Sequence, residues 1–284
     1  MDLFFDLLRS VIYGVIEGIT EWLPISSTGH MILAEQVLKF SFSAEFMEMF
    51  RVVIQLGAIL AVVVMYFKKL WPFCVDNGRD SGLAKHVRWP VMRLWFKIIV
   101  ACLPAAVLGL ALDDWIDAHF YNSVVVAVML IVYGIAFILI ERRPRVPTTT
   151  KLSRITYRQA LLVGAWQVLA LIPGTSRSGS TIIGGLLCGM SRACASQFTF
   201  FLAIPVMAGA SLLKVLKFAV SGVAITGTEV AVLAVGCVVA FVVSLAAIRF
   251  LMDYVKRHNF TFFGIYRIAL GLVVLAVAVV SAMV

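Results

Sequence analysis

The chain has 284 residues, of which 62% are hydrophobic and 14% are charged, and its formal net charge is +9 at pH 7. A soluble domain is roughly 45–50% apolar and about 25% charged, so this composition excludes a soluble enzyme and a disordered chain and favours a polytopic membrane protein. Because the basic residues lie between apolar runs, membrane orientation explains the positive charge, and no nucleic-acid partner is predicted.

The first predicted element, at residues 7–40, consists of two apolar runs separated by a polar break. The break is Trp22-Leu-Pro-Ile-Ser-Ser-Thr-Gly-His30. Each run is too short to cross a bilayer alone, which takes about 20 apolar residues. A polar break at membrane depth is tolerated only where it lines a cavity. We therefore predict a re-entrant helix–loop–helix hairpin.

Three spans, a basic linker at 142–158, a second broken segment at 159–191 and three more spans follow in order. The second break is Ile172-Pro-Gly-Thr-Ser-Arg-Ser-Gly-Ser-Thr181, and it predicts a second re-entrant hairpin. Helix is the predicted spanning form because it satisfies its backbone groups internally. The fold class is thus an all-α integral membrane protein with six transmembrane helices. The predicted spans are 50–67, 94–112, 121–140, 198–217, 229–249 and 262–283.

The charges between the spans predict their orientation. Basic residues concentrate in 68–97, 141–158 and 249–258, whereas a short loop at 113–119 is acidic. The positive-inside rule places the three basic segments in the cytoplasm and the acidic loop outside. These assignments alternate as six spans require, and they place both termini outside.

The two halves of the chain, 1–141 and 159–284, resemble each other. A shift of 150 residues superimposes Gly14 on Gly164, Ser26 on Ser176, Thr28 on Ser178 and Gly29 on Gly179. Coincidence in an apolar chain is the alternative, but the serine–glycine match falls inside both breaks. Three spans per half invert the second half relative to the first. We predict an inverted-topology repeat in a single membrane domain, with its site where the breaks meet near the midplane.

The first half carries two acidic residues close to its break. Glu17 and Glu21 are four residues apart and so share one face of a helix. Ionisable groups inside a membrane are costly and usually functional. The pair can bind a divalent metal ion through carboxylate oxygens, or one carboxylate can act as a general base. Solvation near the membrane interface is the structural alternative.

The first break itself places hydroxyls and an imidazole beside the start of a helix. Ser26, Ser27 and Thr28 supply the hydroxyls, and His30 the imidazole. Unpaired N–H groups and the helix dipole favour an anion at such a position. Capping of the helix by Ser26 or Ser27 is the structural alternative for one hydroxyl. Capping does not account for His30, for which we predict a functional role.

The second break carries Arg177 in an apolar region without an acid nearby in the sequence. Arginine presents a rigid fork that suits phosphate oxygens, and Ser176, Ser178 and Thr181 add hydroxyl donors. An ion pair with one of the acids of the first half is the structural alternative, and it would also bring the breaks together. The first half thus supplies an acid and a base, and the second half supplies an arginine that can bind an anion. Together they predict an enzyme for a phosphorylated substrate that resides in the membrane.

These residues resemble the undecaprenyl-diphosphate phosphatases of the bacitracin-resistance type, and the resemblance covers essentially the whole chain. It rests on Glu17-Gly-Ile-Thr-Glu21-Trp-Leu-Pro-Ile-Ser-Ser-Thr-Gly-His30 and on Pro173-Gly-Thr-Ser-Arg-Ser-Gly-Ser-Thr181. The resemblance implies hydrolysis of undecaprenyl diphosphate to the monophosphate and inorganic phosphate. It also implies recycling of this lipid carrier for peptidoglycan synthesis at the bacterial plasma membrane, bacitracin resistance, a divalent cation (Mg²⁺ or Ca²⁺), and a site that faces outward.

Several roles for the site residues follow as hypotheses. We expect the phosphates to be held by Ser26, Thr28, Ser176, Arg177, Ser178 and Thr181. Glu17 and Glu21 hold the metal ion, or Glu21 is the base. Ser27 is the nucleophile, or it orients a metal-bound water; His30 protonates the leaving oxygen. A transporter or flippase of undecaprenyl phosphate or another anionic lipid is the alternative function, because inverted repeats are a transporter architecture.

Overall fold

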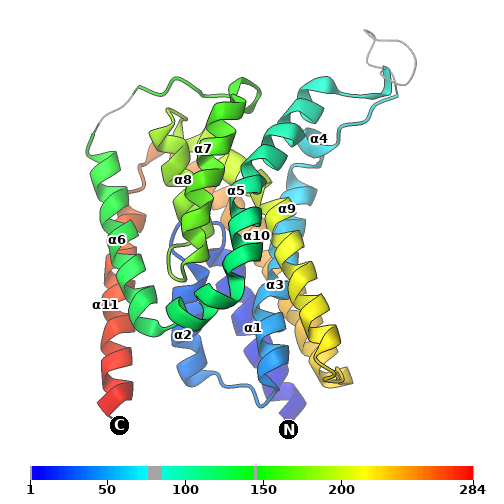
Figure 1. The fold of residues 1–284 in the computed structure, drawn as a ribbon, viewed down its shortest axis with the longest axis vertical. Helices are drawn as coiled ribbons and strands as arrows, with labels where there is room; N and C mark the ends of the chain where they lie inside the picture. Colours follow the sequence, from blue (N-terminus) through cyan, green and yellow to red (C-terminus); the bar gives the residue numbers. More distant parts are fainter. Residues whose placement is uncertain (1, 76–84, 144–145, 284) are drawn as a thin grey trace.

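The apolar runs of the sequence form helices in the computed structural model, which describes residues 2–75, 85–143 and 146–283 (Figure 1). Short 3₁₀ turns lie at Leu152–Arg154 and Leu169–Leu171. The α-helices of the described residues are α1 (Asp2–Thr20), α2 (Ser27–Val37), α3 (Ala44–Met65), α4 (Phe67–Leu70), α5 (Trp89–Phe120), α6 (Ser123–Glu141), α7 (Tyr157–Val168), α8 (Arg177–Leu187), α9 (Arg192–Val220), α10 (Gly227–Arg257) and α11 (Thr261–Met283).

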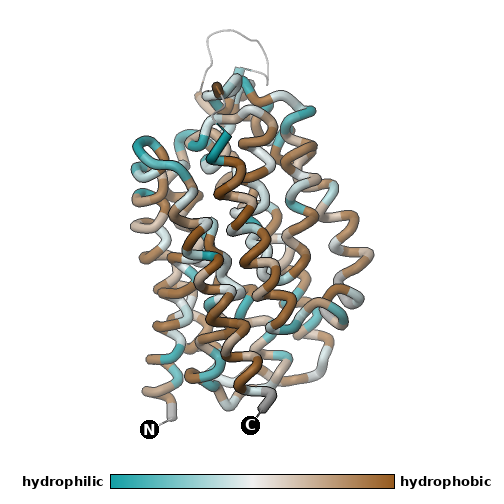
Figure 2. Tube along the Cα trace, turned by 90° about the vertical axis from the view of Figure 1, so that its left-hand side faces the viewer, coloured by the Kyte–Doolittle hydropathy of each residue, from teal (hydrophilic) through white to brown (hydrophobic). Residues whose placement is uncertain are grey.

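Six of these helices are long and apolar enough to cross a membrane: α3, α5, α6, α9, α10 and α11. Each overlaps one predicted span, so the six candidate spanning helices are confirmed. Figure 2 shows long hydrophobic stretches along the helices that face the viewer. On α6 the exposed large side chains recur every three or four residues, at Val124, Val128, Val132, Ile135 and Leu139. Such an apolar face suits lipid rather than water.

The acidic segment 113–119 is helical, so the prediction of a loop there is wrong. It continues α5 to Phe120, beyond the apolar part that ends at Leu112. Trp115 and His119 stack one helical turn apart, and His119 Nδ1 bonds to the Trp115 carbonyl, which supports the extension. Pro104 lies inside α5, where proline removes a backbone hydrogen bond. Figure 1 shows that α5 turns sideways in its lower part before α6 begins.

The two ends of the bundle differ in what they carry. Both termini lie at one end, whereas α4, the 146–156 segment and the connection between α10 and α11 lie at the other (Figure 1). The basic segments are therefore at the end opposite the termini, as the predicted topology requires. Residues 76–84 and 144–145 of those basic segments lie outside the described residues.

The helices α1 and α2, and the helices α7 and α8, form two pairs, joined by irregular connections at 21–26 and 172–176. Both connections lie near mid-height of the bundle (Figure 1). The helix α1 packs on α10, and α7 packs on α5. Beside them α6 and α11 pack closely, because a Cβ atom on Gly134 would come within 2.6 Å of the Gly264 carbonyl oxygen. This contact holds α11 against the region where the two connections meet.

Candidate active site

An ion pair joins the two connections. Arg177 Nη2 lies 2.8 Å from Glu21 Oε1, and the two side chains are only 12% and 9% exposed. The other guanidinium nitrogen, Nη1, donates to the Thr199 carbonyl at 2.8 Å. The Arg177 guanidinium also lies 5.8 Å from the ring centre of Trp22, which is fully buried. The breaks in the two halves of the sequence therefore meet in one place.

Glu21 also accepts a hydrogen bond from the first break. Ser27 Oγ donates to Glu21 Oε2 at 3.2 Å, so one carboxylate oxygen faces the arginine and the other faces a hydroxyl. A hydroxyl bonded to a carboxylate that a third group orients is the usual arrangement of an activated nucleophile. Glu17, one helical turn earlier, is 1% exposed, and its Oε1 atom has no hydrogen-bond partner.

His30 has a defined orientation. Its Nδ1 atom lies 2.7 Å from the Ser26 carbonyl oxygen, and because a carbonyl only accepts, Nδ1 carries a proton. Its Nε2 atom lies 2.8 Å from the hydroxyl of Tyr266 on α11. The two rings stack at 5.7 Å with an interplanar angle of 10°. In the neutral imidazole, Nε2 therefore accepts the tyrosine O–H.

Ser26 and Ser176 precede α2 and α8, and both have a left-handed backbone, with φ of 74° and 68°. Residues other than glycine rarely adopt this conformation. Ser176 Oγ caps α8 by accepting from Gly179 N at 3.1 Å. Ser26 makes no side-chain cap, and its buried Oγ has no partner. Capping therefore does not account for Ser26, whose buried hydroxyl lies directly before the N-terminus of α2 without a partner in the protein.

The remaining predicted phosphate ligands differ in exposure. Thr28 is half-buried in the first turn of α2. Ser178 and Thr181 are at most 1% exposed. Ser178 Oγ donates to the Leu23 carbonyl at 3.4 Å, and Thr181 Oγ1 donates to the Arg177 carbonyl at 2.9 Å. These two hydroxyls hold the second connection in place, and their contact with phosphate stays a prediction.

The sequence analysis missed Arg267 on α11. Its side chain is fully buried and donates to the Pro24 carbonyl at 3.2 Å and to the Gly174 and Thr175 carbonyls at 2.9 Å each. An arginine inside the apolar run 262–283 was the available signal, because ionisable residues within a spanning helix are usually functional. Tyr266 carried no comparable signal.

Comparison with known proteins decides the family. The model of the family described as bacitracin resistance protein BacA matches residues 10–273. This chain belongs to the BacA family. It is 56% identical over 275 residues to a protein of Enterococcus faecalis strain V583, covering 96% of this chain and 98% of that one. It is 57% identical over 276 residues to a protein of Streptococcus mutans, covering 96% of each chain. Both relatives carry the name undecaprenyl-diphosphatase.

The BacA-family site offers a metal ion only part of a coordination sphere. Among the described residues, no group of three or more His, Cys, Asp and Glu side chains is placed to hold a metal ion. Glu17 and Glu21 supply carboxylate oxygens, and Glu17 Oε1 is unpartnered. Mg²⁺ commonly binds to one or two carboxylates plus substrate phosphates and water. The residues therefore fit a cation whose coordination is completed by a phosphorylated substrate.

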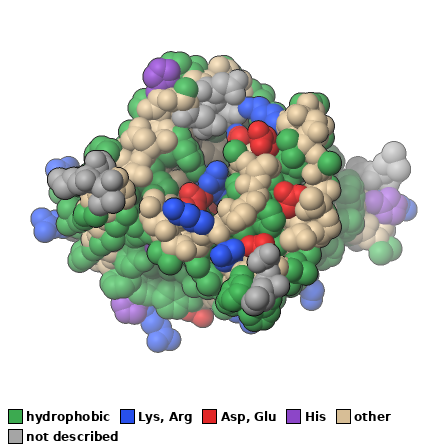
Figure 3. All heavy atoms as spheres, turned by 90° about the horizontal axis from the view of Figure 1, so that it is seen from below, with side chains coloured by type: hydrophobic (Ala, Val, Ile, Leu, Met, Phe, Trp, Pro, Cys, Tyr) green, Lys and Arg blue, Asp and Glu red, His purple; other side chains and the backbone are tan. Residues whose placement is uncertain are grey.

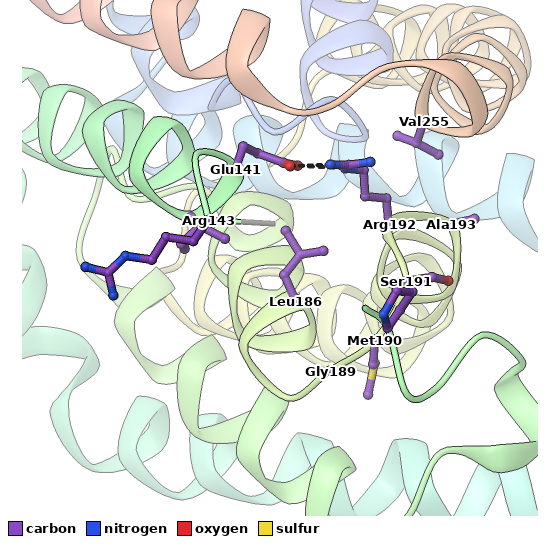
Figure 4. Close-up of a pocket in the computed structure, with 11 residues that line it drawn as sticks. Glu141, Arg143, Leu186, Gly189, Met190, Ser191, Arg192, Ala193 and Val255 are labelled. Atoms are coloured by element: carbon purple, nitrogen blue, oxygen red, sulfur yellow. Dashed lines mark hydrogen bonds and ion pairs between the residues drawn. The ribbon is translucent and has the colours of Figure 1, made fainter. Parts of the chain in front are cut away.

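A cavity of about 350 Å³ lies elsewhere in this BacA-family chain, near the start of α9 (Figure 4). Its lining includes Glu141 and Arg192, which form a double ion pair with one contact of 2.8 Å. Glu141 also accepts from Phe260 N at 3.1 Å. The charges of this pair are thus matched to each other, and the cavity contains none of the predicted site residues. We assign the candidate site to the meeting of the two connections.

A variant series tests the coupling between the two connections. Arg177→Ala leaves the buried Glu21 carboxylate unpaired, so we expect the free energy of unfolding to fall by about 3 kcal/mol. In Glu21→Gln/Arg177→Ala the loss should be smaller than the sum of the single losses, with a coupling of about 1–3 kcal/mol. Unfolding in detergent, followed by tryptophan fluorescence, measures both quantities.

The matched control is Lys256→Ala, which removes the exposed 2.7 Å pair with Asp253 and should leave the melting temperature unchanged. Strictly additive losses in the Glu21 and Arg177 series would contradict the coupling.

Proposed function

We propose that this protein hydrolyses undecaprenyl diphosphate to undecaprenyl phosphate and inorganic phosphate at the bacterial plasma membrane. The activity recycles the carrier lipid for peptidoglycan synthesis and confers bacitracin resistance. Relatives named undecaprenyl-diphosphatase that match nearly the whole chain support it. The observation that carries the proposal is the chain of contacts Arg177–Glu21–Ser27 at two helix N-termini.

The diphosphate binds between the two connections while the polyprenyl chain stays in lipid. The N-termini of α2 and α8 present backbone N–H groups to the phosphate oxygens. Arg177 is partly exposed and has an unpartnered Nε atom, and Ser26 adds its free hydroxyl. Phosphoryl transfer depends mainly on positioning and on stabilisation of charge, which these donors provide. A divalent cation, Mg²⁺ or Ca²⁺, would neutralise phosphate charge. Glu17, whose Oε1 atom has no partner, would hold it where Glu21 is the base, and Glu17 and Glu21 together would hold it where water attacks directly.

The geometry supports Ser27 as the nucleophile. Its Oγ atom attacks the terminal phosphorus and passes its proton to Glu21, and the bond to the bridging oxygen breaks. His30, protonated also at Nε2 for this step, gives the Nε2 proton to the departing undecaprenyl phosphate oxygen, which takes the place of the Tyr266 hydroxyl at this nitrogen. Water then attacks the phosphoserine, neutral His30 takes a proton from this water, and Glu21 returns its proton to Ser27. Phosphate leaves, and every group regains its starting state.

The finer architecture is part of the same proposal: α1 with α2, and α7 with α8, form re-entrant hairpins of an inverted repeat. If the two halves are equivalent, each contact between a helix of one half and a helix of the other should recur between the two corresponding helices. Contacts of α1 with α10 and of α7 with α5 form one such pair, and contacts of α2 with α11 and of α8 with α6 form another. Equal left-handed conformations at Ser26 and Ser176 also support the repeat.

We further propose that the termini and the opening of the site face outward. Basic segments lie at the opposite end of the bundle, which the positive-inside rule places in the cytoplasm. On the end that carries the termini, acidic and basic side chains gather around a central hollow (Figure 3). A charged depression of this kind suits the entry of a diphosphate headgroup.

A phosphate-release assay tests the reaction. Purified protein in detergent should release phosphate from undecaprenyl diphosphate, and a chelator should abolish the release if the cation is required. Arg177→Ala and Glu21→Ala should each lower kcat/KM by at least about a hundredfold, because the first removes charge stabilisation of the transition state and the second removes the general base. Folded wild-type protein that binds the lipid phosphate but releases no inorganic phosphate would favour a flippase of undecaprenyl phosphate. The proposed inverted repeat would also suit a flippase.

Rapid quenching tests the nucleophile. Wild-type protein quenched within its first turnover should carry a phosphoserine at position 27. Ser27→Ala should form none and should lose activity, whereas Ser41→Ala, at an exposed serine after α2, should behave like wild type. Full activity in Ser27→Ala would show that water attacks directly.

Labelling of single cysteines tests the orientation. Val146 and Val220 are 90% and 83% exposed, and they lie toward opposite ends of the bundle. In a background without the five native cysteines, Val220→Cys should react with a membrane-impermeant maleimide in cells stripped of their wall. Val146→Cys should react only after the membrane is permeabilised. The reverse pattern would overturn the proposed orientation.

A further inference from the structure

Tyr266 and Arg267 are adjacent on α11, and Arg267 contacts both connections. The Arg267 guanidinium donates to the Pro24 carbonyl of the first connection and to the Gly174 and Thr175 carbonyls of the second. The connections are about 150 residues apart in the sequence. A single side chain from a third element therefore holds both.

The charge of Arg267 has no matching acid. Its side chain is fully buried, and no ion pair found among the described residues includes it. The guanidinium lies 5.5 Å from the ring centre of Tyr133, and Nε has no hydrogen-bond partner. Burying a cation is costly unless it is paired. A neutral amide would hold backbone carbonyls at lower cost, so the charge itself points to an anion bound at the connections.

The carbonyls that Arg267 binds precede the two left-handed serines. Pro24 is two residues before Ser26, and Thr175 is directly before Ser176. A non-glycine residue keeps a left-handed backbone only where its surroundings impose it. Fixing these carbonyls fixes the peptide planes that lead into α2 and α8. It thereby sets the direction in which the two helix N-termini present their N–H groups.

We propose that Arg267 is a positioning residue, which aims both helix N-termini at one diphosphate and supplies uncompensated positive charge behind them. Its neighbour Tyr266 positions His30 through the 2.8 Å contact between its hydroxyl and Nε2. This inference rests on the proposed phosphatase function. It deepens that function by making α11 a third element of the site, beside the two hairpins.

Arg267→Gln and Arg267→Lys separate charge from hydrogen bonding. Because Arg267 bonds to backbone and not to substrate, we expect kcat of Arg267→Gln to fall by about a hundredfold while KM changes much less. Arg267→Lys should recover part of the loss, because it restores the charge. Arg249→Gln, at an exposed arginine on α10, is the matched control and should resemble wild type.

Three outcomes would overturn the role of Arg267. These are kcat near the wild-type value in both folded variants, a lysine variant no better than the glutamine variant, and loss of folding in both, which would make the residue structural. Melting temperatures in detergent report folding. If wild-type protein itself releases no phosphate, the phosphatase proposal fails instead, so the two failures are distinct.

Tyr266→Phe removes only the hydroxyl that contacts His30. We expect kcat to fall by about tenfold, which is part of the contribution of a well-placed acid or base. In a His30→Ala background the same change should have no further effect, since the tyrosine acts through the histidine. An equal loss in both backgrounds would overturn the positioning role of Tyr266.

Discussion

A helix that ends at membrane depth exposes backbone groups that lipid cannot satisfy, so the protein must satisfy them itself. In the proposed re-entrant arrangement, the connections at 21–26 and 172–176 meet this constraint by facing each other. The Arg267 guanidinium donates hydrogen bonds to carbonyls of both connections, and Ser178 donates to a carbonyl of the first connection. The buried ion pair and the two helix N-termini come together because neither connection can exist without the other. The candidate site therefore lies where the polar groups of the two connections are hydrogen-bonded.

The two halves share a backbone path but differ in chemistry. Ser26 and Ser176 have nearly the same φ, yet the residues that correspond to Glu17 and Glu21 in the second half are Gln167 and Leu171. One half thus supplies the acids and the imidazole, and the other supplies the arginine. The opposite charges of Arg177 and Glu21 attract between the two connections, whereas two acidic connections would repel each other. The difference in charge between the two halves therefore helps to hold the connections together, in addition to its part in the proposed reaction.

Local patterns in the sequence were sufficient for the spans and the breaks, because hydropathy and polarity act over a few residues. The ion pair of Arg177 with an acid was only the structural alternative to its predicted role as a phosphate ligand. Contacts between distant elements were not readable. Arg267 lies 243 residues from Pro24, so only the packing of α11 on α6 reveals its partners. Ser178 and Thr181 turn inward because of the rotation of α8, which tertiary packing sets. The helical extension at 113–119 was missed because its acids resembled a solvated loop.

The left-handed serines have a consequence for resistance to inhibitors. A side chain that binds a drug can be exchanged, but a backbone N–H group is present in every residue except proline. A compound that hydrogen-bonds to the starts of α2 and α8 would contact atoms that only a substitution by proline can delete. Escape would otherwise require a new backbone path at Ser26 or Ser176, where the two connections lead into α2 and α8. Evolution therefore has few routes around a ligand that imitates the diphosphate at this position.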